Sequence, residues 1–201
     1  MTLHQISFFF LCVLLVIVAA MFVHSWLDKR RIFKILSGLP VQIPGRIVQP
    51  SPWVYPHFLG EIEGRAFSFF FQVVHAGRQH ILYSVYHLAT PLTADMLLIK
   101  RGFFKPIADE ARFADAAGEA LPDWDDRYHV RSRSPDAARA WLAGGRLSTP
   151  LGDLSDFVSL QLGPDALVIG KPYTGLEDTD PAQIARHAQA LSRLAAAMGT
   201  A

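Results

Sequence analysis

The hydrophobic pattern opens with one unbroken apolar run. Residues Ile6 to Leu27 include no Asp, Glu, Lys or Arg. At about 1.5 Å of rise per residue, a helix over this run is roughly 33 Å long, which matches the hydrocarbon core of a bilayer. A helix buried in a small soluble domain is rarely apolar on every face. The run therefore predicts a transmembrane anchor over residues 1–28.

A cleaved secretory signal is the main alternative to a retained anchor, because Ala19-Ala20 resembles a small-residue cleavage site. Signal peptides carry basic residues before their apolar core, whereas the basic residues here follow it. Lys and Arg that flank a span stay on the cytoplasmic side. We therefore expect an anchor in the bacterial inner membrane, with the N-terminus outside and the C-terminal domain in the cytoplasm. The residues expected at the membrane interface are Trp26, Lys29, Arg30, Arg31 and Lys34.

Prolines dominate the segment after the basic cluster. They are Pro40, Pro44, Pro50, Pro52 and Pro56. Proline at this density disfavours helix and favours extended chain. Residues 29–57 are therefore predicted to form a basic juxtamembrane segment and a semi-rigid linker. Trp53 and Tyr55 lie in this linker, and because large aromatic side chains are costly to leave in water, they are candidates for docking on a partner.

From residue 58 onward the pattern changes to short alternating segments typical of strands. In the segment 66–74, Phe67, Phe69, Phe71 and Val73 fall on one face, which is the period of a half-buried strand. Further strands are predicted over 59–63, 80–88, 96–100, 127–131, 157–162 and 166–170. Gly64-Arg65 predicts a tight hairpin turn of type II′, with glycine in the first central position.

The sequence predicts the N-termini of two helices between and after the strands. Ser134-Pro135 and Asp180-Pro181 each combine a capping side chain with a proline suited to the first turn. The second helix carries an apolar stripe: Ile184, Ala188, Leu191, Ala195 and Met198. We expect an α+β fold, with one N-terminal transmembrane helix and, over residues 58–201, an antiparallel-sheet domain covered by two helices.

The segments "GEIEGRAF" and "WDDRYHVRSRSPDAARAWL" carry two sparse motifs. Their residues are Gly60, Gly64 and Arg65, then Trp124, Asp125, Tyr128 and Val130. Between Leu59 and Met198 the chain resembles a loose group of uncharacterised bacterial single-pass membrane-anchored proteins with an α+β soluble domain. Tryptophan stands where that group more often has phenylalanine. The resemblance implies a shared architecture and no known activity, so no catalytic residue is carried over.

Net charge and cysteine content argue against nucleic-acid binding and against cysteine-based sites. The formal net charge is +1, so no strong field selects nucleic acid as a partner. The one cysteine, Cys12, lies inside the apolar run, so the chain can form neither an internal disulfide nor a thiolate metal cluster. We expect no cofactor.

Candidate catalytic or metal-binding residues are few. His75 and His80 flank a turn and are expected to face each other, but a stable zinc site needs three or four ligands. Asp123, Asp125 and Asp126 form an acidic cluster, and paired carboxylates serve as acid–base catalysts only when their pKa values are split. Solvated turn histidines and ionised loop aspartates are the plainer interpretation of both groups.

Two functions remain open. The first is a non-catalytic accessory or structural subunit of a larger membrane protein complex, with the lipid bilayer and other integral membrane subunits as partners; a respiratory or photosynthetic complex is one setting that fits. The alternative is a membrane-tethered enzyme, or a small-ligand or metal sensor, built on His75, His80 and the acidic cluster.

Overall fold

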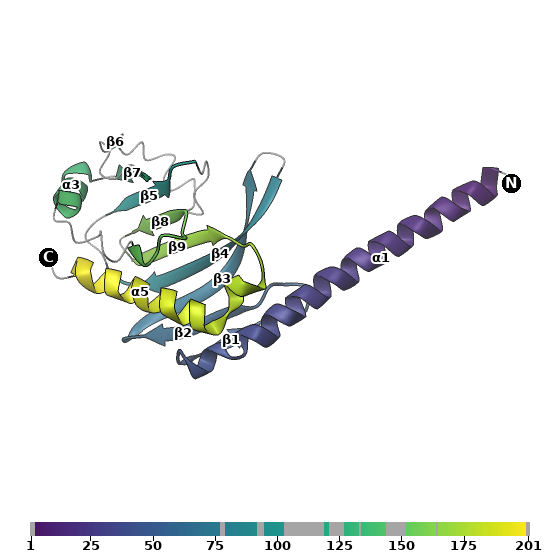
Figure 1. Ribbon diagram of the computed structural model, residues 1–201, viewed down its shortest axis with the longest axis horizontal. Helices are drawn as coiled ribbons and strands as arrows, with labels where there is room; N and C mark the ends of the chain where they lie inside the picture. The colour runs from purple at the N-terminus through teal and green to yellow at the C-terminus, as the bar shows by residue number, and fades with distance from the viewer. Residues whose placement is uncertain are drawn as a thin grey trace.

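The computed structural model describes residues 3–76, 79–91, 95–102, 119–120, 127–132, 134–143, 152–163 and 165–199 (Figure 1). Its helices are α1 (Leu3–Leu36), η1 (Leu39–Val41), α3 (Pro135–Ala143), η2 (Leu176–Thr179) and α5 (Pro181–Gly199), of which η1 and η2 are short 3₁₀ helices. Its strands are β1 (Gly45–Val48), β2 (His57–Ile62), β3 (Arg65–Ala76), β4 (Gln79–Ala89), β5 (Met96–Lys100), β6 (Glu119–Ala120), β7 (Tyr128–Ser132), β8 (Ser159–Leu162) and β9 (Ala166–Pro172).

The strands form one sheet of nine in the order β1-β2-β3-β4-β9-β8-β5-β7-β6. Every pairing is antiparallel, as expected for a chain built from hairpins. The predicted α+β fold, an apolar N-terminal helix followed by an antiparallel sheet with helices, is confirmed.

One face of the sheet carries the main core. On β3 the alternation predicted from the sequence places Phe67 and Phe69 on this face, where both contact Tyr86 of β4. α5 lies across the same face (Figure 1). The apolar stripe predicted for α5 is fully buried there: Ile184, Ala188, Leu191, Ala195 and Met198.

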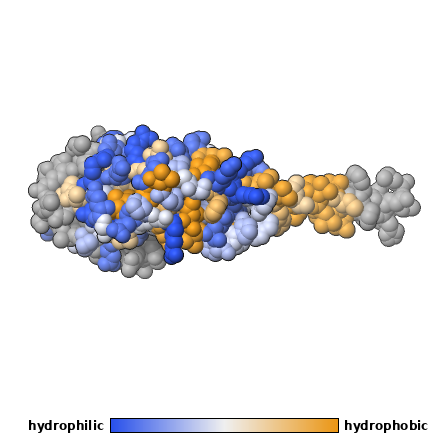
Figure 2. Space-filling view, turned by 90° about the horizontal axis from the view of Figure 1, so that it is seen from below, coloured by the Kyte–Doolittle hydropathy of each residue, from blue (hydrophilic) through white to orange (hydrophobic). Residues whose placement is uncertain are grey.

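α1 is both a candidate membrane span and a core element of the domain. Its residues from Phe10 to His24 are all exposed, and among the described residues the chain has one helix long and apolar enough to cross a membrane. Figure 2 shows this apolar stem leaving a mostly hydrophilic domain. The last two turns bury Ile32 and Leu36, which are 1% and 0% exposed and belong to the main core. The helix therefore passes from the exposed stem into the domain without a break.

The segment 29–57 differs from the extended spacer that its prolines predict. It holds the end of α1, then η1, whose Leu39 is fully buried, and then β1, which pairs with β2. Prolines fit this arrangement because Pro40 lies in the first turn of η1 and the others flank the edge strand β1. The packed core thus begins inside α1 at Ile32, 26 residues before the predicted boundary at residue 58.

The hairpin between β2 and β3 turns one residue earlier than predicted. Ile62 pairs with Arg65, so Glu63 and Gly64 are the two central residues. Their φ angles are 51° and 77°, and positive φ at both positions defines a type I′ turn instead of type II′. Gly64 therefore occupies the second central position of the turn.

The two glycines of the first motif are needed for different structural reasons. Gly64 adopts a left-handed conformation, whereas Gly60 faces Gly45 across the β1–β2 pair. A Cβ on Gly60 would lie 2.5 Å from the ring of Phe58 and 2.6 Å from the backbone oxygen of Pro44. The close approach at Gly60 thus allows β1 to close the edge of the sheet.

We expect Gly60→Ala to lower the free energy of unfolding by about 2–3 kcal/mol, because the added methyl group must displace backbone as well as the Phe58 ring. Thermal or denaturant unfolding of the purified protein measures the effect. Gly152→Ala is the matched control, since nothing lies within 4 Å of a Cβ at that position. Equal stability of the two variants would contradict the close-approach explanation.

Candidate functional site

The principal candidate site is the helix–domain junction, where α1 leaves the domain beside the segment between β1 and β2. The rings of Trp53 and Phe22 are nearly perpendicular, with centroids 5.8 Å apart. The guanidinium of Arg30 lies 5.1 Å from the ring centroid of Trp26, one turn along the helix. The contact between Trp53 and Phe22 holds the segment after β1 alongside the apolar stem.

Local hydrogen bonds give this segment its shape. The side-chain amide of Gln49 donates to the carbonyl of Val54 at 2.9 Å, which closes the loop between them. The backbone N–H of Trp53 donates to the hydroxyl of Ser51 at 3.2 Å. The loop thereby presents Trp53 and Val54 outward, with 53% and 44% of their surfaces exposed.

The two aromatic residues predicted to dock on a partner have different environments. Tyr55 is half-buried, with the ammonium of Lys29 4.8 Å from its ring centroid and the ring of Phe71 at 5.0 Å. Burial, and secondarily the charge of Asp28, raises the pKa of Tyr55. Tyr55 thus connects α1 to the sheet, whereas about half of the surface of Trp53 is exposed to solvent. Docking on a partner stays a prediction for both residues.

The predicted interface residues all lie on α1 near this junction. Lys29 donates to the hydroxyl of Ser25, and Arg31 lies 3.8 Å from the carboxylate of Asp28. Lys34 is exposed one turn further on. Their placement after the apolar stem is compatible with an interfacial role, which stays a prediction.

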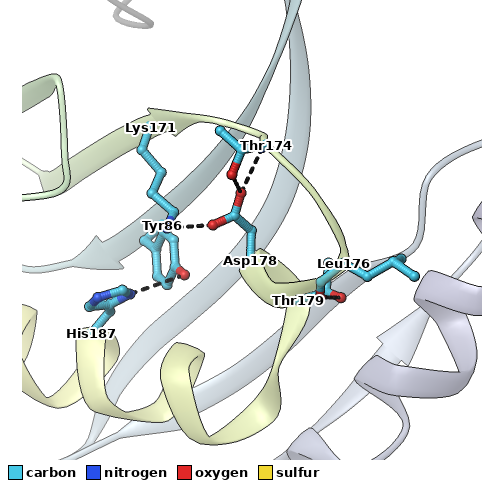
Figure 3. A network of polar contacts seen from close by, with 7 residues as sticks. All are labelled: Tyr86, Lys171, Thr174, Leu176, Asp178, Thr179 and His187. Carbon is cyan, nitrogen blue, oxygen red and sulfur yellow. Dashed lines mark hydrogen bonds and ion pairs between the residues drawn. The ribbon is translucent and has the colours of Figure 1, made fainter.

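A buried polar network, which the sequence did not single out, links β9, η2 and α5 beneath the junction (Figure 3). The ammonium of Lys171 lies 2.5 Å from one carboxylate oxygen of Asp178, and both residues are under 10% exposed. The other oxygen accepts hydrogen bonds from the backbone N–H and the hydroxyl of Thr174, at 2.7 and 2.9 Å. Burial raises the pKa of Asp178, but the hydrogen bonds from Lys171 and Thr174 outweigh it and hold the pKa below its usual value.

The second part of the network is a tyrosine–histidine contact. The hydroxyl of Tyr86 lies 3.4 Å from Nδ1 of His187, which also packs edge-on against the ring of Phe157. Burial lowers the pKa of His187 to about 4, and the positive charge of Lys171 contributes. His187 is therefore neutral at pH 7, and the network fixes α5 and η2 on the sheet.

This histidine predicts a pH dependence of stability. Because the pKa of His187 is about 4 in the folded protein and about 6.5 when unfolded, the unfolded chain binds more protons between those values. Stability is then complete above pH 6.5 and falls as the pH drops towards 4, by on the order of 2–3 kcal/mol. Denaturant unfolding at stepped pH measures this loss.

His187→Gln supplies the comparison for this prediction, since glutamine has no titration in the same range. We expect a flatter stability curve between pH 6.5 and 4 than in the parent protein. His57→Gln is the matched control, because His57 lies on β2 outside the network. Parallel curves for the parent and His187→Gln would show that His187 is not the responsible group.

The remaining site residues predicted from the sequence are the histidine pair His75 and His80 and the acidic cluster. His75 and His80 are paired across the β3–β4 hairpin, with ring centroids 4.4 Å apart, as predicted. Among the described residues, no group of three or more His, Cys, Asp or Glu side chains could hold a metal ion. Asp123, Asp125 and Asp126, together with Trp124 of the second motif, lie outside the described residues.

The first motif has a structural role in the fold. Arg65 extends to α5, where its guanidinium lies 3.4 Å from the hydroxyl of Ser192. That hydroxyl donates to the carboxylate of Glu63 at 2.6 Å. Tyr128 and Val130 of the second motif are buried on β7. Arg65 and Glu63 thereby link the β2–β3 hairpin to α5, and Tyr128 and Val130 contribute to the main core.

The fold and junction define a class: an α+β domain built onto the end of an apolar N-terminal helix. No protein-family model and no curated protein matches the chain. Among solved structures, the crystal structure of the mycobacterial trehalose monomycolate transport factor A, TtfA, is similar over 84% of this chain and 93% of that chain, with a TM-score of 0.55. Sequence identity is 14%, so the similarity establishes a shared fold.

Proposed function

We propose that this chain is a non-catalytic accessory protein of an assembly of integral membrane proteins. In this proposal α1 is retained in a bacterial inner membrane. The N-terminus lies outside and the domain lies on the cytoplasmic side, because the Lys and Arg residues follow the apolar stem.

The observation that carries the proposal is the continuity of α1. Its exposed apolar part leads directly into turns whose Ile32 and Leu36 are core residues. A domain joined in this way is held at one height and one angle to the membrane, whereas a domain on a flexible linker samples many. Fixed placement suits a protein that positions partners in the same membrane.

A hollow beside the junction, on the strands β2 and β3, offers a surface for such a partner. This strand groove has a volume of about 390 Å³ and is lined mainly by Val54, Tyr55, Leu59, Phe70 and Phe71. Leu59 is 40% exposed within it. Because the strand groove adjoins the junction, an apolar edge of a membrane protein next to α1 could fill it.

The structural neighbour, a mycobacterial trehalose monomycolate transport factor, supports an accessory role. The fold therefore occurs in a protein named as a transport factor. This favours a transport setting for the proposed assembly over the respiratory or photosynthetic one.

Site-specific photo-crosslinking in the native membrane tests the proposal. A photoreactive residue at Leu59, inside the strand groove, should give an adduct with one integral membrane protein. The same photoreactive residue at Val41 is the matched control. Val41 lies on η1, is 89% exposed and does not line the strand groove, so it should give no adduct. Recovery of an uncrosslinked monomer from both positions would contradict the proposal, and a C-terminal reporter tests the orientation independently.

The tethered sensor is a second candidate because the rings of His75 and His80 touch. Two imidazoles at this distance can share a metal if further ligands join them. Stoichiometric metal in the purified full chain, lost in both His75→Ala and His80→Ala, would favour this candidate.

A further inference from the structure

The helix–domain junction encloses a hollow that the accessory role leaves unexplained. This junction pocket has a volume of about 270 Å³ and is lined by Trp26, Arg30, Phe33, Gln49 and Pro52. The first three occupy one face of α1, at spacings of four and three residues. The other two come from the segment between β1 and β2, so the pocket exists only because that segment packs beside the helix.

The pocket lies at the level where the apolar stem ends. Phe22, one turn before Trp26, is 58% exposed and touches Trp53. The first charged side chain after the apolar run is Asp28, just before Arg30. One rim of the pocket is therefore apolar and faces the hydrocarbon, while the other is polar and faces the headgroups.

Arg30 is the cation available at this pocket. Lys29 is engaged with Ser25 and Tyr55, and Arg31 pairs with Asp28. In the part of the chain that the structure describes, no carboxylate pairs with Arg30, whose guanidinium lies over Trp26. A guanidinium is suited to bind phosphate oxygens with two parallel hydrogen bonds.

The apolar rim distinguishes a lipid from a free anion. Trp53 follows the pocket residue Pro52 and is 53% exposed, and a free phosphate at Arg30 would leave its ring uncovered. Acyl chains running along Phe22 and Trp53 would cover the exposed part of Trp53 while the headgroup reaches Arg30. Burial of that apolar surface adds to the charge interaction.

We propose that the junction pocket binds the phosphate of an anionic phospholipid, with Arg30 as its donor and the acyl chains along Phe22 and Trp53. The bound lipid fills the space between α1 and the segment after β1, and so steadies the angle of the domain to the membrane. This inference rests on the membrane anchorage of the proposed function and is independent of any protein partner.

Lipid retention by the purified full chain tests the inference. The protein is placed in nanodiscs of phosphatidylcholine with a minor fraction of phosphatidylglycerol, and native mass spectrometry counts the lipids that it retains. We expect phosphatidylglycerol to be enriched, and Arg30→Gln to reduce its retention roughly tenfold. Pro52→Glu, which places a carboxylate at the pocket, should reduce it as well.

Arg31→Gln is the matched control at the same depth. It removes the same charge and also frees Asp28, so a general attraction to anionic lipid would fall at least as much as in Arg30→Gln. An equal loss in the two variants, or equal retention of both lipids by the parent protein, would overturn the proposal. Displacement of the lipid by millimolar inorganic phosphate would identify a free-anion site instead. Because no protein partner is present, failure here leaves the accessory function untouched.

Discussion

A soluble fragment that begins at residue 28 is expected to fold cooperatively, and a fragment that begins at residue 58 is expected not to. The shorter fragment lacks the core residues Ile32, Leu36, Leu39 and Ile43, which are at most 4% exposed. Burial of each such side chain is worth about 1.5–3 kcal/mol, so their loss is comparable with the whole stability of a domain, about 5–15 kcal/mol. Thermal unfolding followed by circular dichroism, with size-exclusion chromatography, distinguishes the two outcomes.

A point variant separates the effect of packing from that of chain length. Leu36→Asp in the longer fragment places an unpaired carboxylate where the side chain is 0% exposed, and we expect a loss above about 4 kcal/mol. Val41→Asp makes the same kind of change at a site 89% exposed and should have little effect. A cooperative transition at similar temperature in the fragment from residue 58 would show that the domain does not depend on α1.

This boundary marks the limit of what the hydrophobic pattern could predict. Alternation in β3 and the stripe on α5 identified elements because each is a repeated, local signal. Ile32 and Leu36 are also spaced one helical turn apart, but the adjacent apolar stem and basic residues favoured a juxtamembrane segment over a core turn. Only the tertiary contact with the sheet distinguishes a core turn from an interfacial one.

The sequence was a weaker guide to the junction and to the buried network. Trp26 and Arg30 were expected at the interface from their position after the stem, but nothing local predicts that Trp53 meets Phe22, since 31 positions separate them. Lys171 follows a run of apolar strand residues, and a lysine there is a signal for a buried partner. Asp180 caps α5 as predicted, whereas Asp178, two residues earlier, forms the buried ion pair with Lys171.

Lys171→Met is expected to be the most damaging single change away from α1, lowering the free energy of unfolding by about 3–5 kcal/mol. The substitution leaves the carboxylate of Asp178 buried, with only the two hydrogen bonds from Thr174 to compensate its charge. Since η2 contacts α1 and leads directly into α5, both helices should loosen. Denaturant unfolding and hydrogen exchange over η2 measure the two effects.

The double variant Lys171→Met with Asp178→Asn isolates the charge from the packing. Asparagine keeps an oxygen for the Thr174 donors and removes the negative charge, so the pair becomes neutral at nearly constant shape. We expect the double variant to recover most of the stability lost in Lys171→Met, because burying the unpaired ion causes most of that loss. If the double variant is as unstable as the single one, packing of the lysine stem, and not the uncompensated carboxylate, holds η2 against α1. The orientation of the domain on its anchor would then depend on shape alone.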